Sequence, residues 1–383
     1  MLIDVDVSRF GLDLPALYKA GLENDRSGTF PVEGVQQLRR TRLMSAAAGG
    51  PAGSPISDRQ LASVAAELGS ACLSTALIWS MHSQQLRVLS RYLPGGDFER
   101  VAAQQELVAS VTTERGKGGD IFRAKQPLIR CGTQLQLVRD APIVSYGGEA
   151  DAFLILMKAS ESASELEPQL VFCRRSDGKA EVTGDWQAMG VRGTRSVPMH
   201  FDLQITEQQL LKGLHRDILL RHYVPLGQIL WSSSWYGAAE GLLQRFLHSH
   251  ARRQSLGRLL DSELMVSRIA HLRIKLVAVA ALIEKALDAY DKNQKEESSG
   301  ALEVRVMYFN ALKVFASESC VEVARGVQAL AGMAGYLASE EPQIEKCLRD
   351  LMSAPLMVNN DLLLSSIGVT EIDQVRKRRS KQF

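Results

Sequence analysis

The sequence predicts an α+β multidomain protein: an N-terminal helical domain, a central antiparallel β-barrel or sandwich, and a C-terminal helical bundle. Three observations support this fold class. The hydrophobic period is helical in residues 1–105, falls toward two in residues 106–206, and is helical again in residues 207–383. Because a helix buries one residue in three or four and a strand every second residue, each change of period marks a change of element type.

Four helices are predicted in the N-terminal domain. They cover residues 14–24, 32–44, 57–68 and 72–93. Pro15 fits the first turn of the first helix, where its missing N–H leaves no hydrogen bond unmade. Residues 45–55 are too rich in glycine and proline to remain regular, so they separate the second helix from the third.

The central domain shows the pattern of strands. Every second residue is apolar from Val197 to Ile205, which is typical of a strand with one buried face. Apolar runs at residues 152–157 and 169–173 have the length of buried strands, and turn signals such as Asp177-Gly178 separate such runs. Short strands joined by turns over roughly 100 residues predict an antiparallel barrel or sandwich.

Long apolar stripes at helical spacing mark the C-terminal domain. One stripe runs from Trp235 to Phe246, and another runs from Ile269 to Ile283. Further helices are predicted at residues 302–315, 321–330 and 344–352, with a polar connection at residues 288–300. Helices with one apolar face and short connections pack antiparallel, so this domain is predicted to be a bundle.

Composition excludes several classes of protein. The 383 residues include 45 basic and 43 acidic ones, and a net charge of +2 favours neither a nucleic-acid partner nor an anionic membrane surface. The five cysteines form no CxxC pair, so we expect no metal site and no disulfide framework. No signal-peptide pattern and no apolar run of transmembrane length occurs, and we therefore expect a cytoplasmic location.

The most informative segment is the polar, glycine-rich loop at residues 113–121, which follows the apolar residues 107–111. Glycine has no Cβ, so such a loop lets backbone N–H groups approach a phosphate closely. The hydroxyl of Thr113, at the start of the loop, can bond a ring edge of the same ligand. Taken alone, a loop of this kind is more often a simple surface turn.

Four motifs in order extend that signal over most of the chain. They are residues 113–120 (TERGKGGD), 189–194 (MGVRGT), 253–257 (RQSLG), and 328–336 (QALAGMAGY) followed by 345–350 (EKCLRD). Together they resemble the acyl-CoA dehydrogenase superfamily, in which the motifs read T-E-P-x-A-G-S-D, M-G-x-R-G-T/S, R-x-x-F-G, and Q-x-x-G-G-x-G-Y followed by E-R-x-x-R-D. The resemblance implies a C-terminal four-helix bundle behind the β domain.

The resemblance also implies a cofactor, FAD, bound non-covalently between the β domain and the bundle. FMN, or reduced flavin taken as a co-substrate, is the alternative. The residues that would meet the flavin ring are Val111, Thr112, Thr113 and Ser145, and those near the pyrophosphate are Gly118 and Gly119. Ile143 occupies a position where the family often has an aromatic residue against the ring, and Gly119 replaces the family's serine.

A second set of residues would contact the FAD of a neighbouring subunit, so the resemblance implies a dimer or tetramer. These residues are Arg253, Leu256, Gln328 and Gly332. Each has an ordinary alternative role. Arg253 could be a surface arginine near a helix C-terminus, Gln328 a polar helix residue, and Gly332 a left-handed helix cap.

The implied reaction is α,β-dehydrogenation of an acyl thioester, carried on CoA or on a carrier protein. A carboxylate must remove the α-proton while a β-hydride passes to flavin N5. The family's customary glutamate falls at Val358, and the alternative position on the first bundle helix falls near Trp231, so both customary bases are absent. Asp361 could serve if the turn shifts, or it could be an ordinary polar residue that starts a helix at residues 362–367.

The missing base leaves two other interpretations open. Relatives of this fold are flavin-dependent monooxygenases, which use O2 and reduced flavin from a reductase and need no α-proton base. His82 lies on a helix that lines the substrate cavity in this fold, where it could donate or accept a proton, or simply pack. The third interpretation is an inactive homologue. An electron-transfer flavoprotein or a flavin reductase is the expected redox partner.

Overall fold

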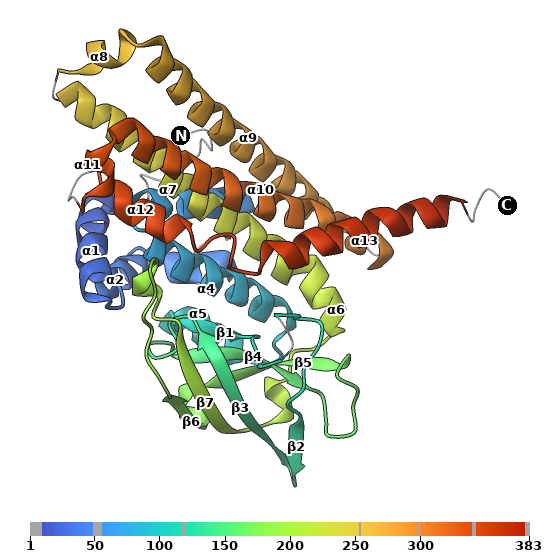
Figure 1. Ribbon diagram of the computed structural model, residues 1–383. Coiled ribbons are helices and arrows are strands. Elements are labelled where there is room, and N and C mark those ends of the chain that lie inside the picture. The colour runs from blue at the N-terminus through green and yellow to red at the C-terminus, as the bar shows by residue number, and fades with distance from the viewer. Residues whose placement is uncertain are drawn as a thin grey trace.

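The computed structural model describes residues 10–48, 56–116, 119–252, 254–296, 299–338 and 342–379. The strands gather at one end of the molecule and the long C-terminal helices at the other, with the N-terminal helices between them (Figure 1). Two of the predicted site residues, Gly118 and Arg253, lie outside the described residues.

The N-terminal part is helical, as the sequence predicts. Its elements are α1 (Leu14–Ser27), α2 (Val32–Arg40), η2 (Leu43–Ala48), α3 (Asp58–Ala71), α4 (Leu73–Tyr92) and α5 (Asp97–Gln104). Asp13 caps α1 by accepting a hydrogen bond from the Ala16 N–H at 3.0 Å, and Gly28 ends that helix with a φ of 67°. The helix predicted at residues 32–44 ends earlier, and η2 covers its last two positions as a 3-10 turn.

The strands form two sheets. The first contains β1 (Val108–Val111), β4 (Ala152–Lys158) and β5 (Pro168–Arg174), and the second contains β2 (Leu128–Cys131), β3 (Gln134–Val144), β7 (Val197–Ile205) and β6 (Gly178–Val182). Neighbouring strands are antiparallel as predicted, except that β1 lies parallel to β4. The register of β3 against β7 shifts between Ala141 and Val144, so that the chain leaves the ladder just before Ser145.

The C-terminal part is a helical bundle, as predicted. Its elements are α6 (His215–Ile218), η6 (Leu219–Tyr223, a π-helical turn), α7 (Val224–Arg252), α8 (Leu256–Leu260), α9 (Glu263–Asn293), α10 (Ser299–Ala331), α11 (Met333–Tyr336), α12 (Ile344–Leu351) and α13 (Asn360–Arg379). Three details differ from the prediction. Helix α13 runs on to Arg379, where a helix at residues 362–367 is predicted. Helix α9 continues to Asn293, into the predicted connection, and the helices expected at residues 302–315 and 321–330 are one, because buried Ala316 and Cys320 continue the apolar stripe.

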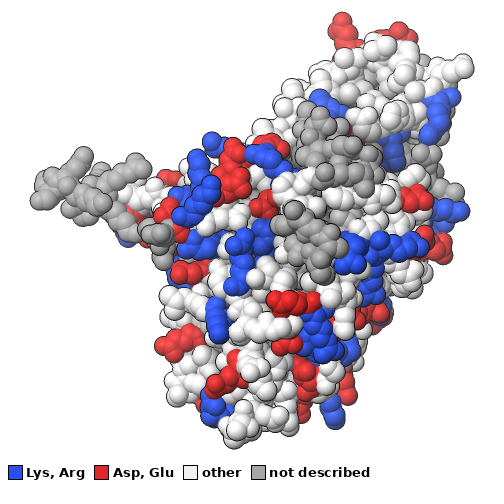
Figure 2. Space-filling model, turned by 180° about the vertical axis from the view of Figure 1, so that it is seen from behind, with Lys and Arg blue, Asp and Glu red and all other residues white. Residues whose placement is uncertain are grey.

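The element type changes between Gln104 and Val108, and again between Ile205 and His215. These changes lie close to the predicted boundaries at residues 105/106 and 206/207. The division into three domains itself stays a prediction. The exposed face in Figure 2 carries basic and acidic side chains interspersed with each other. No helix in the described part of the chain has both the length and the apolar character needed to cross a membrane.

The core of the molecule runs through both helical parts, because α3 and α7 cross at very short range. A Cβ on Gly237 would lie 1.8 Å from the Ala66 carbonyl oxygen, and a Cβ on Gly69 would lie 2.2 Å from the Ser234 carbonyl oxygen. Only glycine allows this backbone approach. The crossing fixes the N-terminal helices against the bundle and thereby sets the position of α4, which contacts both β1 and α7.

Candidate functional site

The β domain and the bundle approach each other on either side of the turn between α12 and α13. On the first side, the Val191 N–H donates to Asp350 Oδ1 of α12 at 2.6 Å, and a Cβ on Gly190 would lie 2.1 Å from the Arg349 carbonyl oxygen. On the other side, a Cβ on Gly119 would lie 4.0 Å from Leu362 of α13. The chain between α12 and α13, residues 352–359, is here called the 352–359 turn. The region between this turn and the strands, where the resemblance implies a flavin, is the candidate site and is called the crevice below.

Thr113 stands at the β side of this crevice. Its hydroxyl donates to the Ile143 carbonyl oxygen at 2.9 Å, and its own carbonyl oxygen accepts from Arg139 Nη2 at 2.7 Å. The Arg139 side chain is fully buried, 3.8 Å from the Glu114 carboxylate, and burial lowers the pKa of its guanidinium. Glu114 in turn accepts the N–H of Lys125 at 3.0 Å. The start of the loop is thus held firmly by the sheet behind it.

Ser145 follows the irregular end of β3 and belongs to a chain of hydroxyls. Its Oγ lies 3.0 Å from Ser196 Oγ, which lies 3.0 Å from Thr194 Oγ1. The Thr194 hydroxyl donates to the Val191 carbonyl oxygen at 2.9 Å. Thr194 and Ser196 are buried, whereas Ser145 is half-buried. Because Thr113 bonds Ile143, two residues before Ser145, the structure brings both predicted hydroxyls to the same end of β3.

A second group of hydroxyls surrounds Tyr223 at the end of the π-helical turn. Tyr223 Oη lies 2.7 Å from Ser110 Oγ of β1. Burial raises the pKa of the Tyr223 phenol, and hydrogen bonds with Ser110, Gln85 and Thr112 oppose that rise. The predicted site residue Thr112 therefore bonds to protein. Val111, at the end of β1, is fully buried.

His82 lies in the core, with both ring nitrogens engaged. Nε2 is 2.7 Å from the Met44 carbonyl oxygen and Nδ1 is 3.1 Å from the Val108 backbone nitrogen. The carbonyl can only accept and the N–H can only donate, so His82 is neutral with its proton on Nε2. Burial lowers its pKa to about 4. This geometry favours the packing alternative for His82 over a proton role.

The two customary base positions carry no carboxylate in the structure either. Val358 sits on the 352–359 turn with a φ of 50°, an unusual conformation for a β-branched residue, and is 42% exposed. Lys313 of α10 lies beneath it, fully buried, with Nζ 2.8 Å from the Val358 carbonyl oxygen and 2.7 Å from Asn360 Oδ1. Burial lowers the pKa of Lys313 to about 7, and the Glu318 charge opposes that fall. The sequence analysis did not identify this lysine.

Trp231, at the alternative base position, lies on a face of α7 with buried polar atoms that have no protein hydrogen-bond partner. These are Trp231 Nε1, Gln228 Oε1 and Ser232 Oγ. Their spacing of three and four residues places them on one side of the helix. The sequence did not predict this polar side of α7, because core packing explains a tryptophan equally well.

Asp361 is exposed in the first turn of α13, and its N–H donates to Asn359 Oδ1 at 2.9 Å. Nearby carboxylates are engaged elsewhere. Glu240 pairs with Arg273 at 2.5 Å, and Asp350 pairs with Lys346 at 2.7 Å. Asp361 is thus an accessible carboxylate next to the 352–359 turn.

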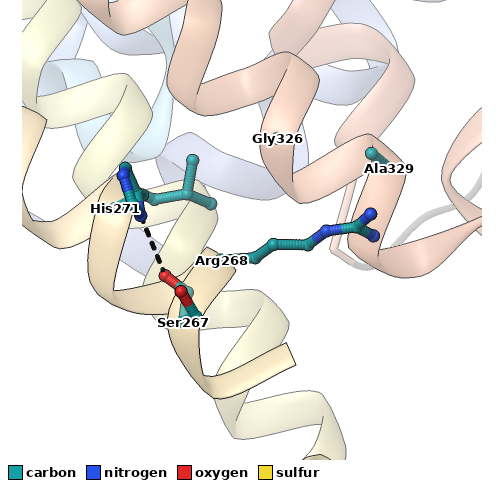
Figure 3. A pocket seen from close by; sticks show the side chains of 6 residues that line it. Ser267, Arg268, His271, Gly326 and Ala329 are labelled. Carbon is teal, nitrogen blue, oxygen red and sulfur yellow. Dashed lines mark hydrogen bonds between the residues drawn. The ribbon is translucent and has the colours of Figure 1, made fainter. Parts of the chain in front are cut away.

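A groove of about 490 Å³ lies between α9 and α10, away from this crevice. Its lining includes Ser267, Arg268 and His271 from α9, and Gly326 and Ala329 from α10 (Figure 3). Gln328 lies beside Ala329 in α10, and its Nε2 is 3.5 Å from the Gly335 carbonyl oxygen. The nearby Gly332 is exposed with a φ of 60°, and Leu256 of α8 is 41% exposed. Elements α8 and α11, which flank or carry these residues, lie at the end of the bundle away from the strands (Figure 1).

Comparison with known proteins identifies the class. Residues 226–357 match the family model of the acyl-CoA dehydrogenase C-terminal domain. Cyclohexane-1-carbonyl-CoA dehydrogenase of Geobacter metallireducens is 23% identical over 277 residues, 70% of this chain and 67% of that protein. With the two-sheet middle and the helical bundle, these matches confirm the resemblance to the acyl-CoA dehydrogenase superfamily.

Two solved structures show how widely the fold is shared. Butyryl-CoA dehydrogenase from Megasphaera elsdenii superposes with a TM-score of 0.80 at 17% identity, over 96% of this chain and 100% of that one. Dibenzothiophene monooxygenase TdsC from Paenibacillus sp. A11-2 superposes with a TM-score of 0.81 at 14% identity, over 94% and 95% of the two chains. One fold therefore accommodates two different flavin reactions.

Proposed function

We propose that this protein is a FAD-dependent oxidoreductase whose flavin ring occupies the crevice between the sheets and the 352–359 turn. The observation that carries the proposal is the pair of hydroxyls, Thr113 and Ser145, held close together at the end of β3. Ile143 is 48% exposed and Val358 is 42% exposed, which suits the faces of an aromatic ring. The residues present thus fit a flavin. When bound, FAD can accept a hydride from a substrate or, once reduced, react with O2.

Two features support FAD rather than FMN. The chain keeps Arg253, Gln328 and Gly332, which in this superfamily face the adenine half of a neighbouring subunit's cofactor. Beside Gln328 lies the groove with Arg268, whose positive charge suits a pyrophosphate. TdsC, by contrast, has been solved with FMN bound. FMN, or reduced flavin taken as a co-substrate, remains the alternative.

The first reaction we propose is α,β-dehydrogenation of an acyl thioester. Its support is the sequence likeness to cyclohexane-1-carbonyl-CoA dehydrogenase, which extends over two thirds of both chains. In this reaction the chain's own residues would hold the ring edge through Thr113 and Ser145 and keep the turn in place through Lys313. Asp361 would take the α-proton. An electron-transfer flavoprotein would then accept the electrons.

The second candidate is flavin-dependent oxygenation. The observation that favours it is specific: Val358 and Trp231 stand where the superfamily has its customary bases, and an oxygenase needs no α-proton base. The fold likeness to dibenzothiophene monooxygenase agrees with it. The packing of His82 argues against the proton donor that the sequence suggested, and the Tyr223 hydroxyl is another candidate for that role.

The site is proposed to be completed by a second copy of the chain. Several exposed apolar side chains lie along α9, including Leu264 (59%), Ile274 (64%) and Val277 (45%). Such a row on a helix is typical of a surface that another chain covers. A dimer or tetramer would also bring Gln328 of one subunit to the cofactor of another.

The discriminating experiment uses the purified chain reconstituted with FAD. A dehydrogenase is bleached anaerobically by its acyl thioester, whereas an oxygenase consumes O2 only when reduced flavin is supplied. Asp361→Asn separates the two further. It should lower dehydrogenation at least about 100-fold if Asp361 is the base, and should leave oxygenation within about threefold. Failure of the chain to bind any flavin would favour an inactive homologue and end the proposal.

A further inference from the structure

The two ring-edge hydroxyls have no proton left to give. A hydroxyl carries one proton, and Thr113 donates its own to the Ile143 carbonyl oxygen at 2.9 Å. A carbonyl oxygen can only accept, so the direction of this bond is fixed. Toward a ligand, Thr113 Oγ1 therefore presents lone pairs alone.

Ser145 Oγ also presents lone pairs alone toward a ligand, because two neighbouring hydroxyls fix the direction of its hydrogen bond. Thr194 gives its proton to the Val191 carbonyl oxygen at 2.9 Å. Ser196 must then supply the proton of its 3.0 Å contact with Thr194. That leaves Ser145 to supply the proton of its 3.0 Å contact with Ser196. The chain runs one way, from Ser145 to Val191, and leaves Ser145 Oγ as an acceptor only.

Hydroxyl oxygens that can only accept hydrogen bonds interact differently with oxidised and with reduced flavin. In oxidised isoalloxazine, N5 is itself an acceptor, so a hydroxyl without a proton cannot bond to it and the two lone pairs repel. In the reduced ring, N5 carries a hydrogen and can donate. N3–H donates in both states and contributes no preference.

We infer that the crevice is built to bind reduced flavin in preference to oxidised flavin, with Ser196 as the positioning residue that keeps Ser145 an acceptor. The inference rests on the proposed flavin site and deepens it. One hydrogen bond gained in place of a lone-pair repulsion corresponds to roughly tenfold tighter binding of the reduced form. For a two-electron couple this is a shift in reduction potential of about +30 mV relative to free flavin.

The test measures binding, not turnover. Dissociation constants are determined for FAD and for anaerobically reduced FAD, together with the reduction potential of the bound cofactor. The wild-type chain should hold reduced FAD about tenfold more tightly. In Ser196→Ala, the Ser145 hydroxyl loses its acceptor and is free to turn and donate to oxidised N5. The ratio of the two affinities should then fall clearly below that of wild type, although Thr113 stays an acceptor, and the bound potential should become more negative.

Ser162→Ala is the matched control, because Ser162 is exposed in a loop and bonds only Ser160 there, at 3.2 Å. It should keep the wild-type ratio. Thermal unfolding of each variant establishes that it folds. Equal affinity for both flavin states in wild type, or an unchanged ratio in a folded Ser196→Ala, would overturn the inference while leaving the flavin site intact. Absence of binding in either state would instead overturn the proposed function.

Discussion

At the residue scale, His82 shows how a side chain suited to proton transfer can serve as a cross-link. It joins α4 to η2 through Met44 and to β1 through Val108. Losing it would leave a buried carbonyl and a buried N–H without partners, each at a cost of about 1–3 kcal/mol. The histidine therefore contributes to the site by holding β1, and through it the Thr113 loop, against α4.

The low pKa of His82 predicts a particular loss of stability in acid. The folded group titrates at about 4, below its ordinary value of 6.5, so between these values the unfolded chain binds a proton that the folded chain does not. Stability therefore falls as pH falls below 6.5. Between pH 7 and pH 5 this group accounts for about 2 kcal/mol of unfolding free energy. His222, with a pKa of about 3, acts in the same direction.

Urea unfolding at the two pH values checks this. His82→Asn should show about 2 kcal/mol less acid-induced loss than the wild type, whereas His248→Asn, which alters an exposed histidine, should match the wild type. Identical pH dependence in His82→Asn and wild type would mean that His82 is open to protons, and its catalytic alternative would return.

Lys313 provides the second prediction at this scale. Its ammonium group bonds the Val358 carbonyl oxygen and Asn360 Oδ1 and lies 5.8 Å from the centre of the Trp235 ring. Lys313→Met keeps the volume but removes the charged donor from the Val358 carbonyl oxygen and leaves Asn360 Oδ1 with Ser317 at 3.4 Å, and should cost roughly 3 kcal/mol in chemical unfolding. Lys285→Met, at an exposed position of α9, should change stability by less than about 0.5 kcal/mol. Equal effects of the two substitutions would contradict the assigned role of Lys313.

Sequence motifs predict some of these site residues and do not predict others. Thr113 and Ser145 are identified by motifs, because their neighbours in the chain carry the resemblance. Lys313 and Ser196 could not be found that way. Lys313 acts on a turn about 45 residues further on, and Ser196 acts on Ser145 across β3 and β7. Such roles depend on contacts between distant segments, which no local pattern encodes.

At the element scale, hydrophobic periodicity predicts the type of each helix or strand more accurately than it predicts where the element ends. Strand β7 matches its predicted alternation from Val197 to Ile205. The prediction divides helix α10 in two, although residues 316–320 contain no glycine or proline to break a helix and buried Ala316 and Cys320 continue its apolar stripe. The parallel pairing of β1 with β4 was missed, since parallel and antiparallel neighbours share one alternation pattern.

The crossing of α3 and α7 makes a prediction about glycine. Gly237→Ala would place a Cβ 1.8 Å from the Ala66 carbonyl oxygen, so the helices must separate, at an expected cost of about 3 kcal/mol or more. Gly368→Ala, in α13 with no atom within 4 Å of the new Cβ, should stabilise the helix by about 0.5–1 kcal/mol. Thermal denaturation measures both. A Gly237→Ala variant as stable as wild type would show that the crossing is looser than described.

At the scale of the whole molecule, the fold does not determine the reaction. Dehydrogenases and a monooxygenase superpose on this chain almost equally well. We expect the distinction to depend on a few side chains of the proposed site, above all on Val358 and Trp231 in place of carboxylates. The direction of the hydroxyl chain bears on the same question, because preference for reduced flavin suits an enzyme that receives its flavin already reduced.

Assembly is also predicted at this scale. The mass in solution, measured by light scattering, should be that of two or four chains. Ile274→Asp introduces a charge on the apolar row of α9 and should shift the protein toward the monomer, with weaker FAD retention because Gln328 no longer reaches a second subunit. Val182→Asp, at a 45% exposed apolar position of β6, is the control and should leave the mass unchanged. A monomeric wild-type chain that binds FAD fully would contradict this arrangement.

The most direct measurement of the central claim is a crystal structure of the chain grown with FAD. The account predicts the isoalloxazine ring in the crevice, with its edge within hydrogen-bond distance of Thr113 Oγ1 or Ser145 Oγ and with the 352–359 turn over the ring. A ring bound elsewhere, or a crevice filled by protein side chains with no space for the ring, would contradict it.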